Sequence, residues 1–366
     1  MSSVNFAAAE VLWYRQSMSD FDFCEGLRRV AAAATAAALT VTAAGAASGA
    51  ERLATILVYH RFGEDHIPST NTPLADFEAH LEHLASEGYS VISLDRLVTA
   101  METGAALPER SVVITIDDAY RSTYEEAWPR LRARGFPFAL FVATEPAGGR
   151  GYMSWDEVLE MDADSLVTIG HHSHSHGHMT NFSAAEREAD FERAAGIFER
   201  EIGYVPEFFA YPYGEYTLSW AEALEDAGMR ASLAQHSGSV GRETSAGVLP
   251  RFAMTGFHTS LDRLKLVLGT EPVLVKNFEP ADPVLDVADN PPLVRFEVDE
   301  LEGDLGGLAC YLGGERAEVV VDGRAVEVRF GGVLPLGRNR LNCTLPRGGG
   351  VWGWLGVLLY YPGNDD

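Results

Sequence analysis

The densest group of metal-binding side chains in this 366-residue chain is the segment 171–178, HHSHSHGH, which has five histidines in eight positions. Imidazole is the commonest protein ligand for zinc and related ions near neutral pH. A hydrolytic metal site keeps three protein ligands and one open position, so a carboxylate must join two imidazoles. His172 and His176 have the spacing that places two rings on one side of a helical turn. The alternative is a solvated loop that binds metal adventitiously.

Two adjacent carboxylates supply a source for the third ligand. Asp117 and Asp118 directly follow the apolar run SVVITI at residues 111–116. Active groups of α/β folds lie just past the carboxyl ends of the strands. Neighbouring acids at a buried strand end repel each other unless something uses them, although one could cap the following helix. The functional interpretation divides the work, with one Asp completing the metal triad and the other acting as base.

The pattern that positions these residues alternates short apolar runs with amphipathic segments from Leu53 onward. We expect strands at 53–59, 90–93, 111–116, 136–144, 166–170 and 208–212. We expect helices at 76–86, 94–102, after the third strand to Arg134, and at 154–161, 183–203 and 218–229. Repeated strand–helix units predict a parallel sheet with helices outside, in an α/β barrel or a doubly wound sheet. No GxGxxG motif or P-loop follows a strand, which argues against nucleotide binding.

Three motifs resemble a known family. TIDDAY at 115–120, the H-S-x-x-H motif from His172 to His176, and FFAYPYG at 208–214 are similar to the first three motifs of the polysaccharide deacetylase family. That family has the NodB-homology domain of carbohydrate esterase family four. The resemblance covers roughly residues 52–270, and it implies a catalytic domain at 51–270 with a distorted (β/α) barrel.

The resemblance also implies residue roles. The base position of the family falls on Asp117, and its three metal ligands fall on Asp118, His172 and His176. His171, His174 and His178 match no ligand position. Tyr213 corresponds to the residue whose backbone N–H stabilises the oxyanion. Zinc is the expected divalent metal, while cobalt, nickel or iron also suit mixed His and Asp ligands.

Many members of the family carry the general acid as a histidine in a late L-x-H motif. No clear copy of that motif follows Arg251 in this chain, so the acid must be sought elsewhere. His60, at the end of LVYH, resembles the acid of the branch that acts on poly-β-1,6-N-acetylglucosamine, and His236 is the second candidate. A hydrogen-bonded strand-end histidine is the structural alternative for His60. Arg251 is a candidate for orienting Asp117.

Together these assignments predict a metal-dependent hydrolase that removes N-acetyl groups from N-acetylglucosamine units of an envelope or extracellular polysaccharide. An O-deacetylase, a peptidoglycan deacetylase and a non-catalytic carbohydrate-binding or export scaffold are the alternatives. The expected partner is an acetylated polysaccharide, and no protein partner is implied. Nucleic acid is an unsuitable partner, because 53 acidic residues outnumber 28 basic ones.

Residues 1–50 have the pattern of a targeting segment. Arg28 and Arg29 precede a run of small apolar residues that ends in two A-x-A-like sites. We expect cleavage near Ala47 or Glu51 and export to the periplasm or the extracellular space. Met18 would give a signal of more ordinary length, so the residues before it suggest a mis-called start. Membrane contact is expected only if the segment stays uncleaved.

Past Gly269 the sequence changes character. Residues 271–292 are rich in Pro, Asp and Val and predict a linker, and 293–366 predict a small β-sandwich-like domain. Cys310 and Cys343 are an even pair, which in an oxidising compartment predicts one disulfide. Two unpaired buried thiols are the alternative. The terminal run VWGWLGVLLYYPG suggests core packing or, alternatively, a platform for stacking sugars.

Overall fold

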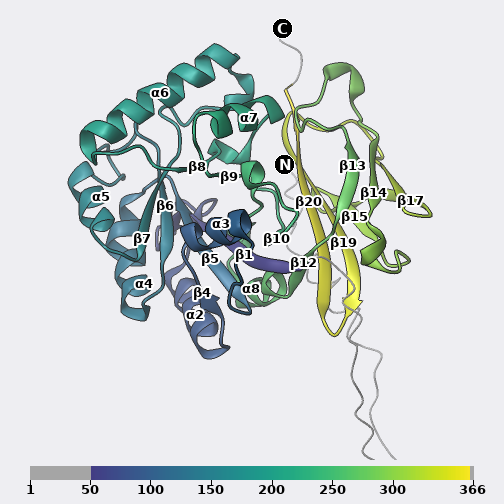
Figure 1. The fold of residues 1–366 in the computed structure, drawn as a ribbon, viewed down its shortest axis with the longest axis horizontal. Helices are drawn as coiled ribbons and strands as arrows, with labels where there is room; N and C mark the ends of the chain where they lie inside the picture. The colour runs from purple at the N-terminus through teal and green to yellow at the C-terminus, as the bar shows by residue number, and fades with distance from the viewer. Residues whose placement is uncertain (1–50, 363–366) are drawn as a thin grey trace, which may run out of the picture. The chain divides into compact units, whose positions relative to one another are not determined.

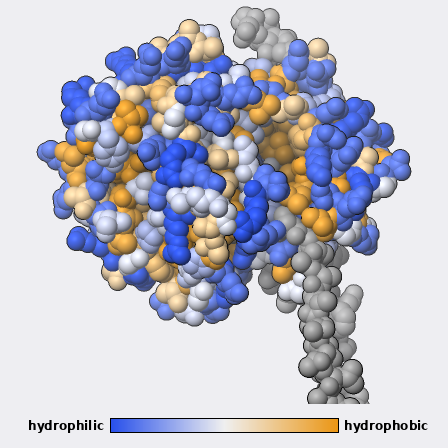
Figure 2. Space-filling view, in the orientation of Figure 1, coloured by the Kyte–Doolittle hydropathy of each residue, from blue (hydrophilic) through white to orange (hydrophobic). Residues whose placement is uncertain are grey.

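The computed structural model describes residues 51–362, so the predicted leader at 1–50 lies outside the described residues. Among the helices in the described range, none has both the length and the apolar character needed to cross a bilayer. Figure 2 shows hydrophilic side chains over much of the visible face, with hydrophobic patches between them. This surface is in keeping with the large excess of acidic residues.

Nine strands form one α/β sheet whose order is β10-β1-β5-β6-β7-β8-β9, with β4 beside β5 and β11 beside β1. Their bounds are β1 (Arg52–Tyr59), β4 (Ser90–Val91), β5 (Ser111–Asp117), β6 (Phe138–Val142), β7 (Val167–His171), β8 (Phe208–Ala210), β9 (Ala231–Leu233), β10 (Ser239–Gly241) and β11 (Phe252–Ala253). All of these pairings are parallel except β1 with β10. The short strands β2 (Arg61–Phe62) and β3 (Asn71–Thr72) pair separately. The predicted parallel sheet is therefore confirmed.

Helices lie around this sheet in Figure 1. They are α2 (Leu74–Ser86), α3 (Leu94–Thr103), the π-helical turn η1 (Thr123–Ala127), α4 (Trp128–Arg134), α5 (Trp155–Asp162), α6 (Ala184–Glu201), α7 (Leu218–Asp226) and α8 (Leu261–Leu268). Short 3₁₀ turns follow the same order: η2 (Met179–Asn181), η3 (Pro212–Gly214), η4 (Ala246–Val248), η5 (Gly256–His258), η6 (Val287–Asp289) and η7 (Glu300–Glu302). Capping boxes at Ser154 and Ser183 begin α5 and α6. The predicted helices are confirmed, with the third divided between η1 and α4.

The sheet curls because one short segment bonds to strands near both of its ends. Leu249 forms a parallel bridge with Leu233 of β9, and Phe252 pairs with Leu57 of β1. Fully buried Leu, Ile, Val and Phe side chains from the strands fill the core. The result is a curled half barrel, which confirms the predicted distorted (β/α) barrel.

Two further sheets follow towards the C-terminus. One has the order β12-β20-β19-β15-β16 and the other β13-β14-β18-β17. Their bounds are β12 (Thr270–Pro272), β13 (Val275–Glu279), β14 (Val294–Val298), β15 (Ala309–Leu312), β16 (Glu315–Arg316), β17 (Glu318–Asp322), β18 (Ala325–Arg329), β19 (Gly337–Gly348) and β20 (Val351–Tyr361). Both sheets contribute side chains to one hydrophobic core, among them Phe296, Val328, Leu341 and Leu359. Strand β13 and the last two residues of β12 lie in the predicted linker at 271–292, and the described residues 51–362 belong to one compact unit.

Strand β20 also packs closely against the α/β part of the chain. The Trp354 ring lies 5.6 Å from the ring of Phe252, centroid to centroid. A Cβ atom at Gly356 would overlap the carbonyl oxygen of Ser237, so only glycine permits this approach. For Trp354 the structure therefore supports the packing role over a free sugar-stacking platform.

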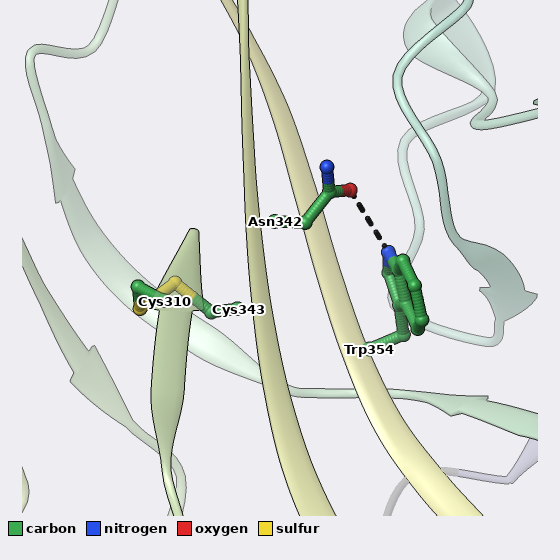
Figure 3. The surroundings of a disulfide bond; sticks show 4 residues. All are labelled: Cys310, Asn342, Cys343 and Trp354. Carbon is green, nitrogen blue, oxygen red and sulfur yellow. Dashed lines mark hydrogen bonds between the residues drawn. A yellow bond between two sulfur atoms is a disulfide. The ribbon is translucent and has the colours of Figure 1, made fainter. Parts of the chain in front are cut away.

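The two cysteines form a disulfide inside the C-terminal sheets (Figure 3). Cys310 on β15 and Cys343 on β19 are direct cross-strand partners, and both are buried. On the neighbouring strand β20, the indole N–H of Trp354 donates to Asn342 Oδ1 at 3.1 Å. The cystine therefore joins two adjacent strands at the centre of this core, as the even cysteine count predicted.

Replacing both cysteines, as Cys310→Ala with Cys343→Ala, is expected to lower the free energy of unfolding by about 3–4 kcal/mol. The reason is that a bridge across a separation of 33 residues restricts the unfolded chain. Urea denaturation of the variant beside the wild type measures the loss, and wild type held in reductant should match the variant. An unchanged denaturation midpoint would contradict this role for the bridge.

Candidate metal and catalytic site

The predicted site residues lie at one edge of the sheet, where three parallel strands end. Asp117 is the last residue of β5 and His171 is the last residue of β7. Strand β8 ends at Ala210, and Tyr213 follows in η3. Because parallel strands end at the same edge, residues from distant parts of the sequence meet there.

Asp118, His172 and His176 form one compact group. Asp118 Oδ1 lies 3.3 Å from His172 Nε2 and 2.9 Å from His176 Nε2. One potential ligand atom from each residue lies within 4.8 Å of the other two. Asp118 and His172 are buried, while His176 is partly exposed. The group could therefore hold a metal ion that remains open to solvent on one side.

A loop, not a helical turn, brings the two histidines together, so the expected helical geometry at 172–176 is wrong. Ser173 and His176 have φ values of 64° and 51°, which lie in the left-handed region and cannot continue an α-helix. The loop is held instead by hydrogen bonds. The Ser173 hydroxyl accepts from the His176 N–H, and the Asp190 carboxylate on α6 accepts from the N–H groups of His174 and Ser175.

The donor pattern around His172 suits a cation. Its Nδ1 lies 2.6 Å from the carbonyl oxygen of Ala210, and a carbonyl only accepts, so Nδ1 must carry the proton. In the neutral ring, Nε2 then turns a lone pair towards Asp118 Oδ1, which is buried and has no hydrogen-bond partner. Two buried acceptors that face each other repel, and a bound cation removes that repulsion. Two imidazoles and a carboxylate also form a known hydrolytic zinc ligand set.

Asp117 is fixed by a buried arginine. Arg251 Nη1 donates to Asp117 Oδ1 at 2.7 Å and Nη2 donates to Oδ2 at 2.8 Å, and both side chains are fully buried. Arg251 Nε donates to the carbonyl oxygen of Ala234. Burial by itself raises the pKa of Asp117, but Arg251, His172 and His60 outweigh it and hold that pKa below its usual value. Asp117 is therefore a carboxylate at neutral pH.

The two candidate acids occupy different positions. His60 Nε2 lies 4.0 Å from Asp117 Oδ2, and its buried Nδ1 has no hydrogen-bond partner. Burial lowers the pKa of His60, against the opposing effect of Asp118 and Asp117. His236 instead accepts the backbone N–H of Arg251 with its carbonyl oxygen, and burial lowers its pKa to about 4. His60 is therefore the one that faces the base.

Tyr213 lines the same pocket as Asp118 and His176, and its ring lies 4.8 Å from the His176 ring, centroid to centroid. Its φ of 59° is left-handed, and Gly214 next to it packs so closely on Gln235 that a Cβ atom would not fit. The pocket has a volume of about 290 Å³ and is lined by Asp118, Tyr120, Glu145, Pro146, Tyr152, Ser175, His176 and Tyr213.

Sequence reasoning did not single out the contributions of Tyr120, Glu145 and Tyr152 to this pocket. The rings of Tyr120 and Tyr152 lie 4.8 Å apart, and the two residues form an antiparallel bridge. Tyr120 ends the TIDDAY motif and could have been noticed there, while Tyr152 reaches the site only through this pairing. Aromatic side chains of this kind give a sugar ring apolar surface to pack on.

Comparison with known proteins agrees with this geometry. Residues 104–232 match the model of the family described as polysaccharide deacetylase. YxkH of Bacillus subtilis, whose assignment as a polysaccharide deacetylase is itself provisional, is 23% identical over 54% of this chain and 69% of its own. The Escherichia coli poly-β-1,6-N-acetyl-D-glucosamine N-deacetylase is 26% identical over 40% of this chain, but only 28% of that relative is covered.

The fold is also found among solved structures. The Streptococcus pyogenes deacetylase PplD, solved in complex with acetate, superposes with a TM-score of 0.55 at 17% identity. The match covers 60% of this chain and 99% of that one. At this identity the likeness concerns the fold alone, so the chemistry must be argued from the residues described above.

We expect the purified chain to bind one zinc ion, and Asp118→Asn to weaken that binding by more than about 100-fold. Losing even an outer partner of a ligand typically costs 10–100-fold, and Asp118 contacts both imidazoles. Isothermal titration of the metal-stripped protein with Zn²⁺ gives both affinities. His178→Ala is the matched control, because His178 lies in the same loop but outside the ligand group. Equal affinities for Asp118→Asn and wild type would rule out this metal site.

Proposed function

We propose that this chain, whose residues 104–232 match the polysaccharide deacetylase family, is a metal-dependent hydrolase that removes N-acetyl groups from N-acetylglucosamine units of an envelope or extracellular polysaccharide. The main support is that Asp118, His172 and His176 form a potential metal-binding group next to Asp117, whose carboxylate is held by Arg251. A non-catalytic scaffold has no use for such a buried charged carboxylate next to three potential metal ligands.

Two features support the proposed substrate class. The pocket beside the ligand group is bordered by tyrosines, which suit the apolar faces of sugar rings. The name of the E. coli relative gives poly-β-1,6-N-acetyl-D-glucosamine as the polymer on which that protein acts. We extend to this chain the shared chemical unit, an N-acetylated glucosamine in a polymer. The predicted export signal would bring the enzyme to a polymer outside the cytoplasm.

Asp118, His172 and His176 would hold the divalent ion, zinc in the first instance, which when bound lowers the pKa of a water molecule and polarises a carbonyl group. The remaining work belongs to the protein. Asp117 acts as the general base, because its Oδ1 keeps a lone pair beyond the one that accepts from Arg251 Nη1, whereas Oδ2 accepts from both Arg251 and Gln235. It takes a proton from the attacking water.

His60 and Tyr213 complete the reaction. In its protonated form His60 gives its proton to the departing amine, and the burial that lowers its pKa favours this release. The backbone N–H of Tyr213 donates to the oxygen on which negative charge develops, as oxyanion-hole donors do. The amide carbon–nitrogen bond breaks, and the products are acetate and a glucosamine unit.

The zinc-loaded full chain is expected to release acetate from β-1,6- or β-1,4-linked N-acetylglucosamine oligomers. In Asp117→Asn the rate should fall about 10²–10⁴-fold, because the base is lost. Acetate is measured by a coupled assay, and the preferred linkage indicates the polymer. Asp156→Asn is the matched control, since this acid is exposed at the start of α5 and should leave the rate unchanged.

Other outcomes distinguish the alternatives. Release from O-acetylated polymer alone would replace the proposal with an O-deacetylase, and release from glycan strands of peptidoglycan alone would point to a peptidoglycan deacetylase. No release from any of these substrates by chain with bound metal would favour the non-catalytic scaffold.

A further inference from the structure

Beyond the residues that perform the chemistry, one arginine from the C-terminal sheets reaches the loop that carries Tyr213. Arg338, on β19, donates from Nη1 to the carbonyl oxygen of Tyr213 at 3.3 Å. Its guanidinium carbon lies 5.4 Å from the centre of the Tyr213 ring. These contacts join residues 125 positions apart in the sequence. We propose that Arg338 is a positioning residue that holds the Tyr213 loop, so that the C-terminal sheets complete the active site.

The buried carboxylate of Glu215 contacts both Arg338 and the histidine loop, residues 171–178. Glu215 is 1% exposed, although it lies two residues past Tyr213. Its Oε1 lies 3.6 Å from Arg338 Nε, and its Oε2 lies 2.9 Å from His178 Nδ1. A charge this deeply buried needs partners, so the arginine contact is more than an exposed surface pair, whose effect is generally small.

The two partners of Glu215, His178 and Arg338, also contact the Tyr213 ring. The ring of His178 stacks on that of Tyr213, with centroids 4.1 Å apart and planes 8° apart. Arg338 contacts both the ring and the backbone of Tyr213. Glu215 thus binds the two side chains that hold Tyr213.

Strand β20, next to β19, makes a second contact with the segment that follows the histidine loop. Tyr360 on β20 is the direct cross-strand partner of Arg338, and its hydroxyl donates to Asn181 Oδ1 at 3.1 Å. Asn181 ends η2, the turn that follows the histidine loop. A single cross-strand pair therefore contacts both the turn that follows the histidine segment and the Tyr213 loop.

Tyr213 needs such support because of its backbone. A non-glycine residue keeps a left-handed φ, here 59°, only where its surroundings enforce it. If the loop relaxes, the Tyr213 N–H no longer points where the oxyanion forms, and the hydrolysis slows even though the metal ligands and Asp117 are intact. The catalytic part of this inference rests on the proposed function, whereas the effect on the loop does not.

The test compares Arg338→Ala with Arg340→Ala in the zinc-loaded full chain. Arg340 lies two residues along β19 on the same face and loses the same charge, but within residues 51–362 it has none of the contacts described for Arg338. Arg338→Ala is expected to lower kcat for acetate release about 10-fold with KM changed less than 2-fold, since a misplaced donor loses part of its effect. Arg338→Lys, which keeps the charge beside Glu215, should recover part of the rate.

Hydrogen exchange of the peptide that spans Tyr213 provides a readout independent of activity. Exchange in this peptide should rise in Arg338→Ala and stay at the wild-type level in Arg340→Ala, with zinc affinity unchanged in both. Unchanged exchange, or faster exchange with an unchanged kcat, would overturn the proposal. If the wild type releases no acetate from any substrate, the proposed function fails by itself, and the exchange measurement still decides whether Arg338 holds the loop.

Discussion

The structure depends most on the buried ion pair between Arg251 and Asp117. Arg251 belongs to the short segment between Leu249 and Phe252 that bonds to β9 at one end of the curled sheet and to β1 near the other. The contact that fixes the charge of Asp117 is thus made by the segment that joins the two sides of the half barrel. Removing one partner of a buried pair typically costs about 3–5 kcal/mol, because the other charge is left uncompensated. Fold and chemistry therefore share one interaction, and a change at Arg251 would affect both.

A second constraint is the unusual backbone of the loops that leave the strands. Asp118, Ala119, Ser173, His176 and Tyr213 all have positive φ values, which disfavour non-glycine residues. Such conformations persist where neighbouring contacts over-determine them, and they cluster at functional sites. Here the contacts come from helix α6 through Asp190, from Gln235 behind Gly214, and from the C-terminal sheets. The side chains that would hold the metal are thus presented by strained turns supported from three directions.

Much of the fold and of the ligand group could be predicted from the sequence, for physical reasons. Continuous apolar runs predict strands that are buried on both faces. Because active groups follow the carboxyl ends of such strands, the sequence also predicts that Asp118 and His172 lie at the same edge of the sheet. The helical turn at 172–176 was wrong because four-residue spacing has several backbone solutions, and the bonds from Asp190 select a loop. The grouping of Tyr120 with Tyr152, and of Glu215 with Arg338, depends on pairings between distant segments that local pattern does not encode.

The C-terminal sheets illustrate how such distant contacts change an interpretation. By composition alone, β-rich sequence after a Pro-rich stretch suggests a separate module joined by a linker. Yet β12 pairs with β20, Trp354 packs on Phe252, and Gly356 lets the strand approach Ser237. Phe252 follows Arg251 directly in the chain, so the sheet that carries Arg338 packs against the same segment that holds Asp117. Strand β20 thus packs against the segment whose Arg251 holds Asp117. Strand β19, beside β20, contacts the Tyr213 loop through Arg338. The residues around the proposed reaction centre are held from both parts of the chain.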